Sequence, residues 1–171
     1  MITIREEQIS DIEPIRVVNT RAFGQAAEAD VVDKLRQVCP EGLSLVAVCE
    51  DQIVGHILFT PALIEAKGQI IQGMGLAPLA VLPEFQGQGI GSKLVQEGLA
   101  AMRKAQQPFV LVLGHPEYYP RFGFVRSVDY GIVSEYDNVP EEAFMILVLD
   151  EVRLQEISGI GKYRPEFEAA M

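Results

Sequence analysis

The stretch "VLPEFQGQGIGSKL", residues 81–94, lies where the sequence changes from an apolar run, "LAPLAV", to a segment with helical periodicity. Gly87, Gly89 and Gly91 occupy alternate positions in it. Glycine weakens regular structure, so three of them at a strand-to-helix junction indicate a backbone conformation or a close approach that other residues do not allow. A strand, a glycine-rich loop and a helix start together also form an arrangement that binds phosphate, because unpaired N–H groups and the helix dipole converge there.

Two familiar phosphate-binding loops do not fit this stretch. A P-loop needs Gly-Lys-Ser/Thr at its end, whereas Gly91 is followed by Ser92 and Lys93. A dinucleotide-binding loop needs the spacing GxGxxG in a parallel unit, whereas the spacing here is GxGxG and the strands before it look antiparallel. The residues alone therefore leave two readings open, an anion site of another kind and a tight turn without a ligand.

The rest of the chain alternates between strand and helix patterns. Pro78 interrupts the strand that leads into the loop, and because proline removes a ladder donor, we expect that strand to be unpaired on one side there, or bulged. The order of elements predicts an α/β sandwich with a mostly antiparallel sheet. Strands are predicted over 2–6, 43–49, 53–66, 69–81, 109–114 and 143–150, with another near Phe124, and helices over 10–23, 28–38 and 87–106; the first helix is expected to open with a capping box formed by Ser10 and Glu13.

Composition indicates an ordinary soluble protein of one domain. The chain has 171 residues, of which 49% are hydrophobic and 22% are charged. No apolar run is long enough to cross a bilayer and the N-terminus lacks the features of a signal peptide, so we expect a cytoplasmic location. We expect a domain over residues 1–150 and a C-terminal extension over 151–171 packed on it.

Charge and cysteine content restrict the ligands that we expect. The net charge of −10 argues against nucleic-acid binding and favours cationic small molecules. Cys39 and Cys49 are expected to be free thiols, and no Cys/His spacing predicts a metal site.

Two motifs resemble those of the GNAT superfamily of acyl-CoA-dependent N-acyltransferases. Residues 86–91, "QGQGIG", fit its Gln/Arg-x-x-Gly-x-Gly/Ala signature, and "YYPRFGF" resembles its Tyr-x-x-x-Gly-Phe element at Tyr119, Gly123 and Phe124. The resemblance covers residues 2–149, and the "YYPRFGF" form and the tail look like a small bacterial branch of predicted N-acetyltransferases. It implies a mixed, mostly antiparallel sheet with helices on both faces and a splayed strand pair that holds acyl-CoA.

The resemblance also implies the residues of the site. The loop N–H groups would hold the pyrophosphate of coenzyme A, and the edge near Pro78 would offer backbone partners to the pantetheine arm. Tyr119 would act as the general acid that protonates the departing thiolate. The residues implied to bind acetyl-CoA are Leu79, Ala80 and Val81 on the strand and Gln86, Gly87, Gln88, Gly89, Ile90, Gly91 and Ser92 in the loop and helix start.

The general base stays open at this point. Many relatives place a Glu on the strand before the loop, but "GMGLAPLAV" contains no carboxylate. His115, Glu28 and Glu117 acting through water are the candidates, and each also has a plain structural reading. His56 lies in the middle of a strand and is expected to be structural.

The leading functional reading is an N-acetyltransferase that moves an acetyl group from acetyl-CoA to an amine of a small molecule or a protein by direct attack. The alternative is a non-catalytic acyl-CoA-binding sensor or subunit, which the missing strand carboxylate favours and Tyr119 disfavours. No metal, nucleic acid or membrane partner is expected, and a homodimer is compatible with family precedent. The acceptor, the preferred acyl chain and the role of the extension are left open.

Overall fold

The computed structural model describes all 171 residues and divides the chain into two compact units. The first unit comprises residues 1–59, 77–100 and 165–171, and the second comprises residues 60–76 and 101–164. The residues of three elements are divided between the two units: β3 (Gln52–Ala66), β4 (Gln69–Val81) and α3 (Ile90–Lys104). No helix combines the length and the apolar character that a membrane-crossing segment requires.

The strands form one mixed sheet, as the sequence predicts. Its order is β1 (Ile2–Glu6), β2 (Leu43–Cys49), β3, β4, β5 (Phe109–Leu113), β8 (Phe144–Val148) and β6 (Val125–Arg126). Strand β9 (Gly159–Lys162) pairs with β3 and with β7 (Ile132–Ser134). The pairs β1 with β2, β2 with β3, β3 with β9, β5 with β8 and β6 with β8 are antiparallel, whereas β4 with β5 and β7 with β9 are parallel. The fold is therefore α/β with a mostly antiparallel sheet.

The first unit contains the N-terminal elements, and most of its boundaries agree with the predicted ones. The start of the first helix differs, because a short 3₁₀ turn precedes it and Asp11 accepts the Gln8 N–H at 2.7 Å. The predicted capping pair, Ser10 and Glu13, is therefore not the one that opens it. Apart from the shared elements, the unit contains β1 (Ile2–Glu6), η1 (Ile9–Asp11), α1 (Ile12–Phe23), α2 (Ala27–Val38), β2 (Leu43–Cys49), η2 (Pro83–Phe85) and η6 (Pro165–Ala170).

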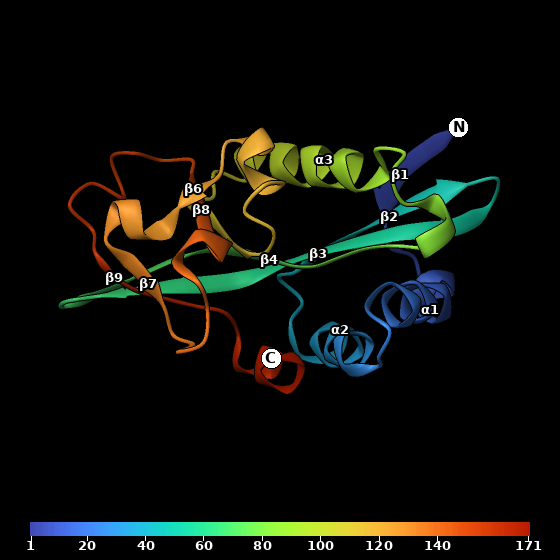
Figure 1. Ribbon diagram of the computed structural model, residues 1–171, viewed down its shortest axis with the longest axis horizontal. Helices are drawn as coiled ribbons and strands as arrows, with labels where there is room; N and C mark the ends of the chain where they lie inside the picture. Colours follow the sequence, from blue (N-terminus) through green and yellow to red (C-terminus); the bar gives the residue numbers. More distant parts are fainter. The chain divides into compact units, whose positions relative to one another are not determined.

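Helices cover both faces of the strands in the first unit, with α1 and α2 on one side and α3 on the other (Figure 1). Alternation along β3 assigns its side chains to these faces. A Cβ on Gly55 would lie 3.0 Å from Leu94 of α3, and a Cβ on Gly98 would collide with the Phe59 ring. The absent side chains of Gly55 and Gly98 thus let α3 lie directly on β3.

The opposite face of β3 carries a buried polar chain around His56, which is fully buried. Asn19 of α1 donates to its Nδ1 at 3.0 Å, and Nε2 lies 2.9 Å from the Ser44 hydroxyl. Because Ser44 gives its one proton to Glu7 at 2.7 Å, His56 must donate through Nε2 and is therefore neutral. Burial lowers the pKa of His56 to about 4 despite the nearby Glu7 carboxylate. The imidazole is structural, as the sequence suggests.

The second unit is built around β5 and β8, whose residues are almost all buried. Gly73 on β4 leaves room for Phe109, since a Cβ there would lie 2.7 Å from the ring. Apart from the shared elements, the unit contains β5 (Phe109–Leu113), η3 (Tyr119–Phe122), β6 (Val125–Arg126), η4 (Ser127–Tyr130), β7 (Ile132–Ser134), η5 (Glu141–Ala143), β8 (Phe144–Val148) and β9 (Gly159–Lys162).

The C-terminal segment contributes a strand that the sequence pattern did not indicate. Residues 159–162 of β9 pair antiparallel with residues 63–66 of β3 and parallel with β7. Lys162 also forms an ion pair with Glu65 at 2.6 Å. The expected division into a domain over 1–150 and an extension over 151–171 stays a prediction, and the extension includes part of the sheet.

The state of His56 predicts how stability depends on pH. In the unfolded chain its pKa returns to about 6.5, so between pH 6.5 and 4 the unfolded state binds a proton that the folded state does not. The free energy of unfolding should therefore fall by about 2 kcal/mol between pH 7.5 and pH 5, before most carboxylates titrate. Urea unfolding at several pH values measures this. His56→Gln should flatten the dependence, His115→Gln should preserve it, and a flat wild-type profile would contradict the assignment.

Candidate functional site

The glycine-rich loop begins where β4 ends and is anchored there by two hydrogen bonds. Leu82 donates its N–H to the Val54 carbonyl at 2.9 Å, and the Gln86 side-chain amide donates to the Val81 carbonyl at 3.0 Å. Between these bonds, η2 carries the chain over to Gln86. The side chain of the first residue in the motif thus holds the start of the loop to the end of the strand.

Two of the three glycines are required by backbone conformation. Gly87 has φ +79° and Gly89 has φ +82°, values that other residues rarely adopt. A Cβ on either would have no atom within 4 Å, so neither glycine is explained by close packing within the protein. Residues 86–89 are exposed. The loop therefore presents its backbone to open space.

Helix α3 starts directly after the loop, later than the predicted position 87. Lys93 donates its N–H to the Gly89 carbonyl at 3.1 Å, which makes Gly89 the residue that caps the helix. The N–H groups of the first helical turn have no acceptor within the helix, and the helix dipole places partial positive charge on them. Ile90 fixes this end, since it is 2% exposed and its side chain lies next to Gly55. The loop and helix start together form an anion-binding geometry.

A charged pair that no sequence pattern indicates lies immediately before the loop. Arg21 of α1 donates to both carboxylate oxygens of Glu84 at 2.7 Å. The hydrogen bond from Arg21 lowers the pKa of Glu84, which therefore stays ionised. Both side chains are about half exposed, so the pair contributes little to stability. Its effect is to offset the negative charge nearest the loop.

The ten residues expected to bind a coenzyme occupy the first unit, in the single stretch 79–92. Leu79 and Val81 are half-buried and Ala80 is buried, as alternation along a strand requires. The register of β4 with β5 runs through Leu76↔Val112, and β5 ends at Leu113. Pro78 thus lies beyond the end of β5, as the missing N–H of proline predicts.

Tyr119 belongs to the second unit, where its ring is buried in an aromatic cluster. It makes edge-on contacts with Tyr118 and Phe124 at centroid distances of 5.1 and 5.7 Å. Gly114 makes room for it, because a Cβ there would lie 2.5 Å from the ring. Gly123 ends the 3₁₀ turn with φ +99°, which explains the glycine of the second motif. Burial, with a smaller effect of Tyr118, raises the pKa of Tyr119 well above its usual value.

The candidates for a general base lie at three positions. His115 and Glu117 are exposed, and the His115 carbonyl accepts the Tyr118 N–H at 3.1 Å. Glu28, in the first turn of α2, is half-buried and accepts hydrogen bonds from Gln25 at 3.1 and 3.2 Å. None of these contacts selects one candidate, so the base stays a prediction.

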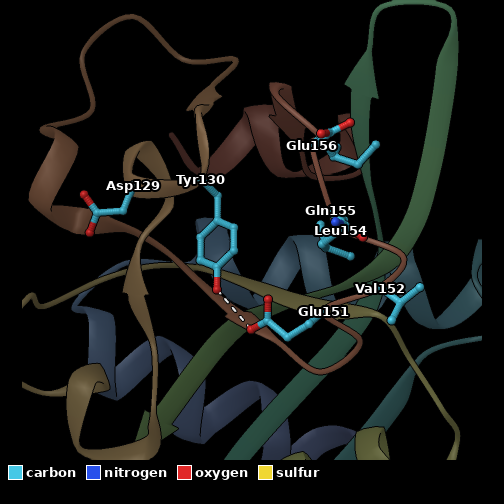
Figure 2. Close-up of a pocket in the computed structure, with 8 residues that line it drawn as sticks. Asp129, Tyr130, Glu151, Val152, Leu154, Gln155 and Glu156 are labelled. Carbon is cyan, nitrogen blue, oxygen red and sulfur yellow. Dashed lines mark hydrogen bonds between the residues drawn. The ribbon is translucent and has the colours of Figure 1, made fainter.

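A separate hollow of about 490 Å³ lies on the second unit (Figure 2). Two of its carboxylates already have partners, since Tyr130 donates to Glu151 at 3.1 Å and Asp129 pairs with Arg126 at 2.9 Å. None of the residues expected from sequence lines it. Its lining is Asp129, Tyr130, Glu151, Val152, Leu154, Gln155, Glu156 and Ile157.

Comparisons with known proteins identify the family. The acetyltransferase (GNAT) domain family matches residues 3–126. The chain is 40% identical over 158 residues to the uncharacterized N-acetyltransferase YjhQ of Escherichia coli K12, covering 91% of this chain and 87% of that protein. It is 33% identical over 165 residues to the uncharacterized N-acetyltransferase YhbS of the same organism, covering 96% and 97%.

Solved structures agree with these matches. The crystal structure of YhbS from Escherichia coli in complex with CoA superimposes with a TM-score of 0.88 at 32% identity, covering 98% of this chain and 92% of that one. A GNAT family acetyltransferase from Brucella melitensis in complex with acetyl-CoA gives a TM-score of 0.79 at 35% identity, covering 98% of both. The family match, the relatives and the fold together make this chain an acetyltransferase of the GNAT family.

Proposed function

We propose that the chain transfers the acetyl group of acetyl-CoA to the amine of an acceptor by direct attack. The observation that carries the proposal is the exposed loop at the start of α3. Gly87 and Gly89 adopt positive φ there, and a Cβ on either would have no atom within 4 Å. Such a loop suits the pyrophosphate of a coenzyme, because several N–H groups and the helix dipole meet one doubly charged group. Two similar proteins hold CoA or acetyl-CoA in their crystal structures.

In this proposal residues 86–92 hold the pyrophosphate and residues 79–81 offer backbone groups to the pantetheine arm. The backbone does the binding, which explains why three of the six residues from Gln86 to Gly91 are glycine and none of the six has a cationic side chain. The Arg21–Glu84 pair supports the same assignment, because it offsets a carboxylate that would otherwise repel a phosphate.

The reaction is a simple displacement at a thioester. The neutral amine nitrogen attacks the carbonyl carbon, a C–N bond forms, the C–S bond breaks, and the electron pair of that bond leaves on sulfur. The amine nitrogen loses one proton and the sulfur gains one, so the products are an amide and free CoA thiol. No redox partner or metal is needed for the balance.

Tyr119 is the proposed acid for the thiolate. Its raised pKa means that the phenol is protonated at neutral pH. A thiol of pKa near 8.5 is a stronger acid than this phenol, so full proton transfer before C–S cleavage is unfavourable. Tyr119 therefore acts as a hydrogen-bond donor whose contribution grows as negative charge develops on sulfur.

The acceptor is proposed to be a cationic amine, in line with the net charge of −10. Such an amine must lose a proton before it attacks, and His115, Glu117 and Glu28 remain the proposed routes, directly or through water. The absence of a carboxylate from residues 73–81 favours the alternative of a non-catalytic acyl-CoA-binding protein. Turnover with any amine, measured as CoA release, rejects that alternative.

Replacing Gly89 by alanine tests the loop. Gly68, in the β3–β4 turn, has a similar φ of +78° and equally open surroundings, so Gly68→Ala is the matched control. Each substitution should lower the free energy of unfolding by about 1 kcal/mol, the cost of placing a Cβ in the left-handed region. Only Gly89→Ala should weaken acetyl-CoA binding in calorimetry, by about tenfold, because its Cβ displaces a charge-assisted hydrogen bond. Equal affinities would reject the loop as the pyrophosphate site.

Replacing Tyr119 by phenylalanine tests the acid. The variant should lower kcat by about 100-fold, the usual contribution of such a proton donor, while the Kd for acetyl-CoA changes little. Tyr118→Phe removes a hydroxyl from the neighbouring ring and should leave kcat close to the wild-type value. Full activity of Tyr119→Phe would remove Tyr119 from the mechanism without affecting the coenzyme assignment.

A further inference from the structure

Tyr163 comes from the C-terminal segment and reaches β4 and β5, which pair with each other in parallel. Its hydroxyl accepts the Leu113 N–H at 3.2 Å and lies 3.1 Å from the Leu76 carbonyl and 3.3 Å from the Leu111 carbonyl. Leu76 is the last β4 residue paired with β5, Leu111 lies opposite Gly75, and Leu113 ends β5 one residue beyond the paired region. One side chain thus bonds to both strands at the end of their ladder.

The Tyr163 hydroxyl has three backbone partners but only one proton to donate. A phenol has one proton, so it donates to the Leu76 carbonyl or shares the proton with the Leu111 carbonyl while accepting from Leu113. In a parallel pair, N–H and carbonyl groups of these residues would otherwise bond to one another across the two strands. Here a hydroxyl lies between the groups of the two strands at the point where β5 ends.

Several contacts fix the ring and its backbone. Gly75, next to Leu76, leaves the space that the ring occupies, because a Cβ there would lie 2.6 Å from Tyr163 Cε1. The Tyr163 N–H donates to Glu135 at 2.8 Å, and the preceding residues of β9 are paired with β3. Tyr163 is buried, and burial raises its pKa well above the usual value, so the hydroxyl keeps its proton. The hydroxyl is therefore held in one place.

We propose that Tyr163 is a positioning residue for acyl transfer, whose hydroxyl sets the geometry at which β4 leaves β5. The proposal rests on the proposed use of acetyl-CoA, for which residues 79–81 are the backbone partners. These residues follow Leu76 on the same strand after only two others, Ala77 and Pro78. Losing the hydroxyl lets the ladder end close or shift, and the thioester then lies less favourably for attack.

Tyr163→Phe is the sharpest test, because the ring keeps its packing on Gly75 and only the hydroxyl is lost. We expect kcat to fall by roughly tenfold or more, as small displacements of reacting groups cost that much. The KM for acetyl-CoA should change less. The Leu113 amide should exchange with solvent about tenfold faster, whereas amides of β8 stay protected.

Tyr130→Phe is the matched control, since it removes a tyrosine hydroxyl that bonds to Glu151 in the same unit (Figure 2). It should leave kcat and Leu113 exchange unchanged. Gly75→Ala is the second variant, because its Cβ displaces the Tyr163 ring; it should lower kcat as Tyr163→Phe does, and the double variant should be no worse than Gly75→Ala alone.

Each outcome bears on the proposal. Faster Leu113 exchange with unchanged kcat overturns it and leaves Tyr163 as a residue of the fold only. An unchanged Leu113 exchange rate overturns it as well, because the hydroxyl then does not hold the ladder end. If the wild-type protein neither binds acetyl-CoA nor releases CoA in the presence of amines, the proposed function fails and the positioning role fails with it. Wild-type turnover together with normal turnover of Tyr163→Phe rejects the positioning role alone.

Discussion

The close approach of α3 to β3 is the constraint on which the candidate site depends. Gly55 on the strand and Gly98 on the helix bring the two backbones together, and Ile90 and Leu94 fill the space between them. This packing fixes where the helix begins, and the helix start determines where its free N–H groups point. The Gln86 side chain and the buried Ile90 hold the two ends of the loop, so the residues between them can include glycines.

The same use of absent side chains recurs in the second unit. Gly73 and Gly75 lie on alternate positions of β4, so they share one face, and each makes room for an aromatic ring, Phe109 or Tyr163. Glycines in a strand weaken it on propensity alone. Gly73 and Gly75 allow large aromatic rings to be buried against the backbone of β4. The apolar contact of these rings offsets the low strand propensity of glycine. The strand before the loop is thus shaped by what packs on it.

The sequence predicted the parts of the molecule that depend on local rules. The loop was found because Gly87 and Gly89 need positive φ, and Pro78 located the part of β4 beyond the end of β5 because proline has no N–H. Strand β9 was not predicted, because its sequence "GIGK" has no strand pattern. Its glycines are required by close contacts with residues elsewhere in the chain, Gly159 with Glu65 and Gly161 with Phe144. The Tyr163 and Arg21 contacts join residues 87 and 63 positions apart, which no local pattern encodes.

The state of the buried histidine restricts which groups of the chain can act as the general base. His56 would be the obvious base by residue type, but Asn19 and Ser44 occupy both ring nitrogens and its pKa near 4 makes it a weak acceptor. The raised pKa of Tyr119 keeps its phenol protonated, so this residue cannot act as the base. In the proposed mechanism the proton of the acceptor amine therefore leaves through an exposed or half-buried group or through water. Direct attack by an amine tolerates this, because the amine can lose its first proton to solvent before it meets the thioester.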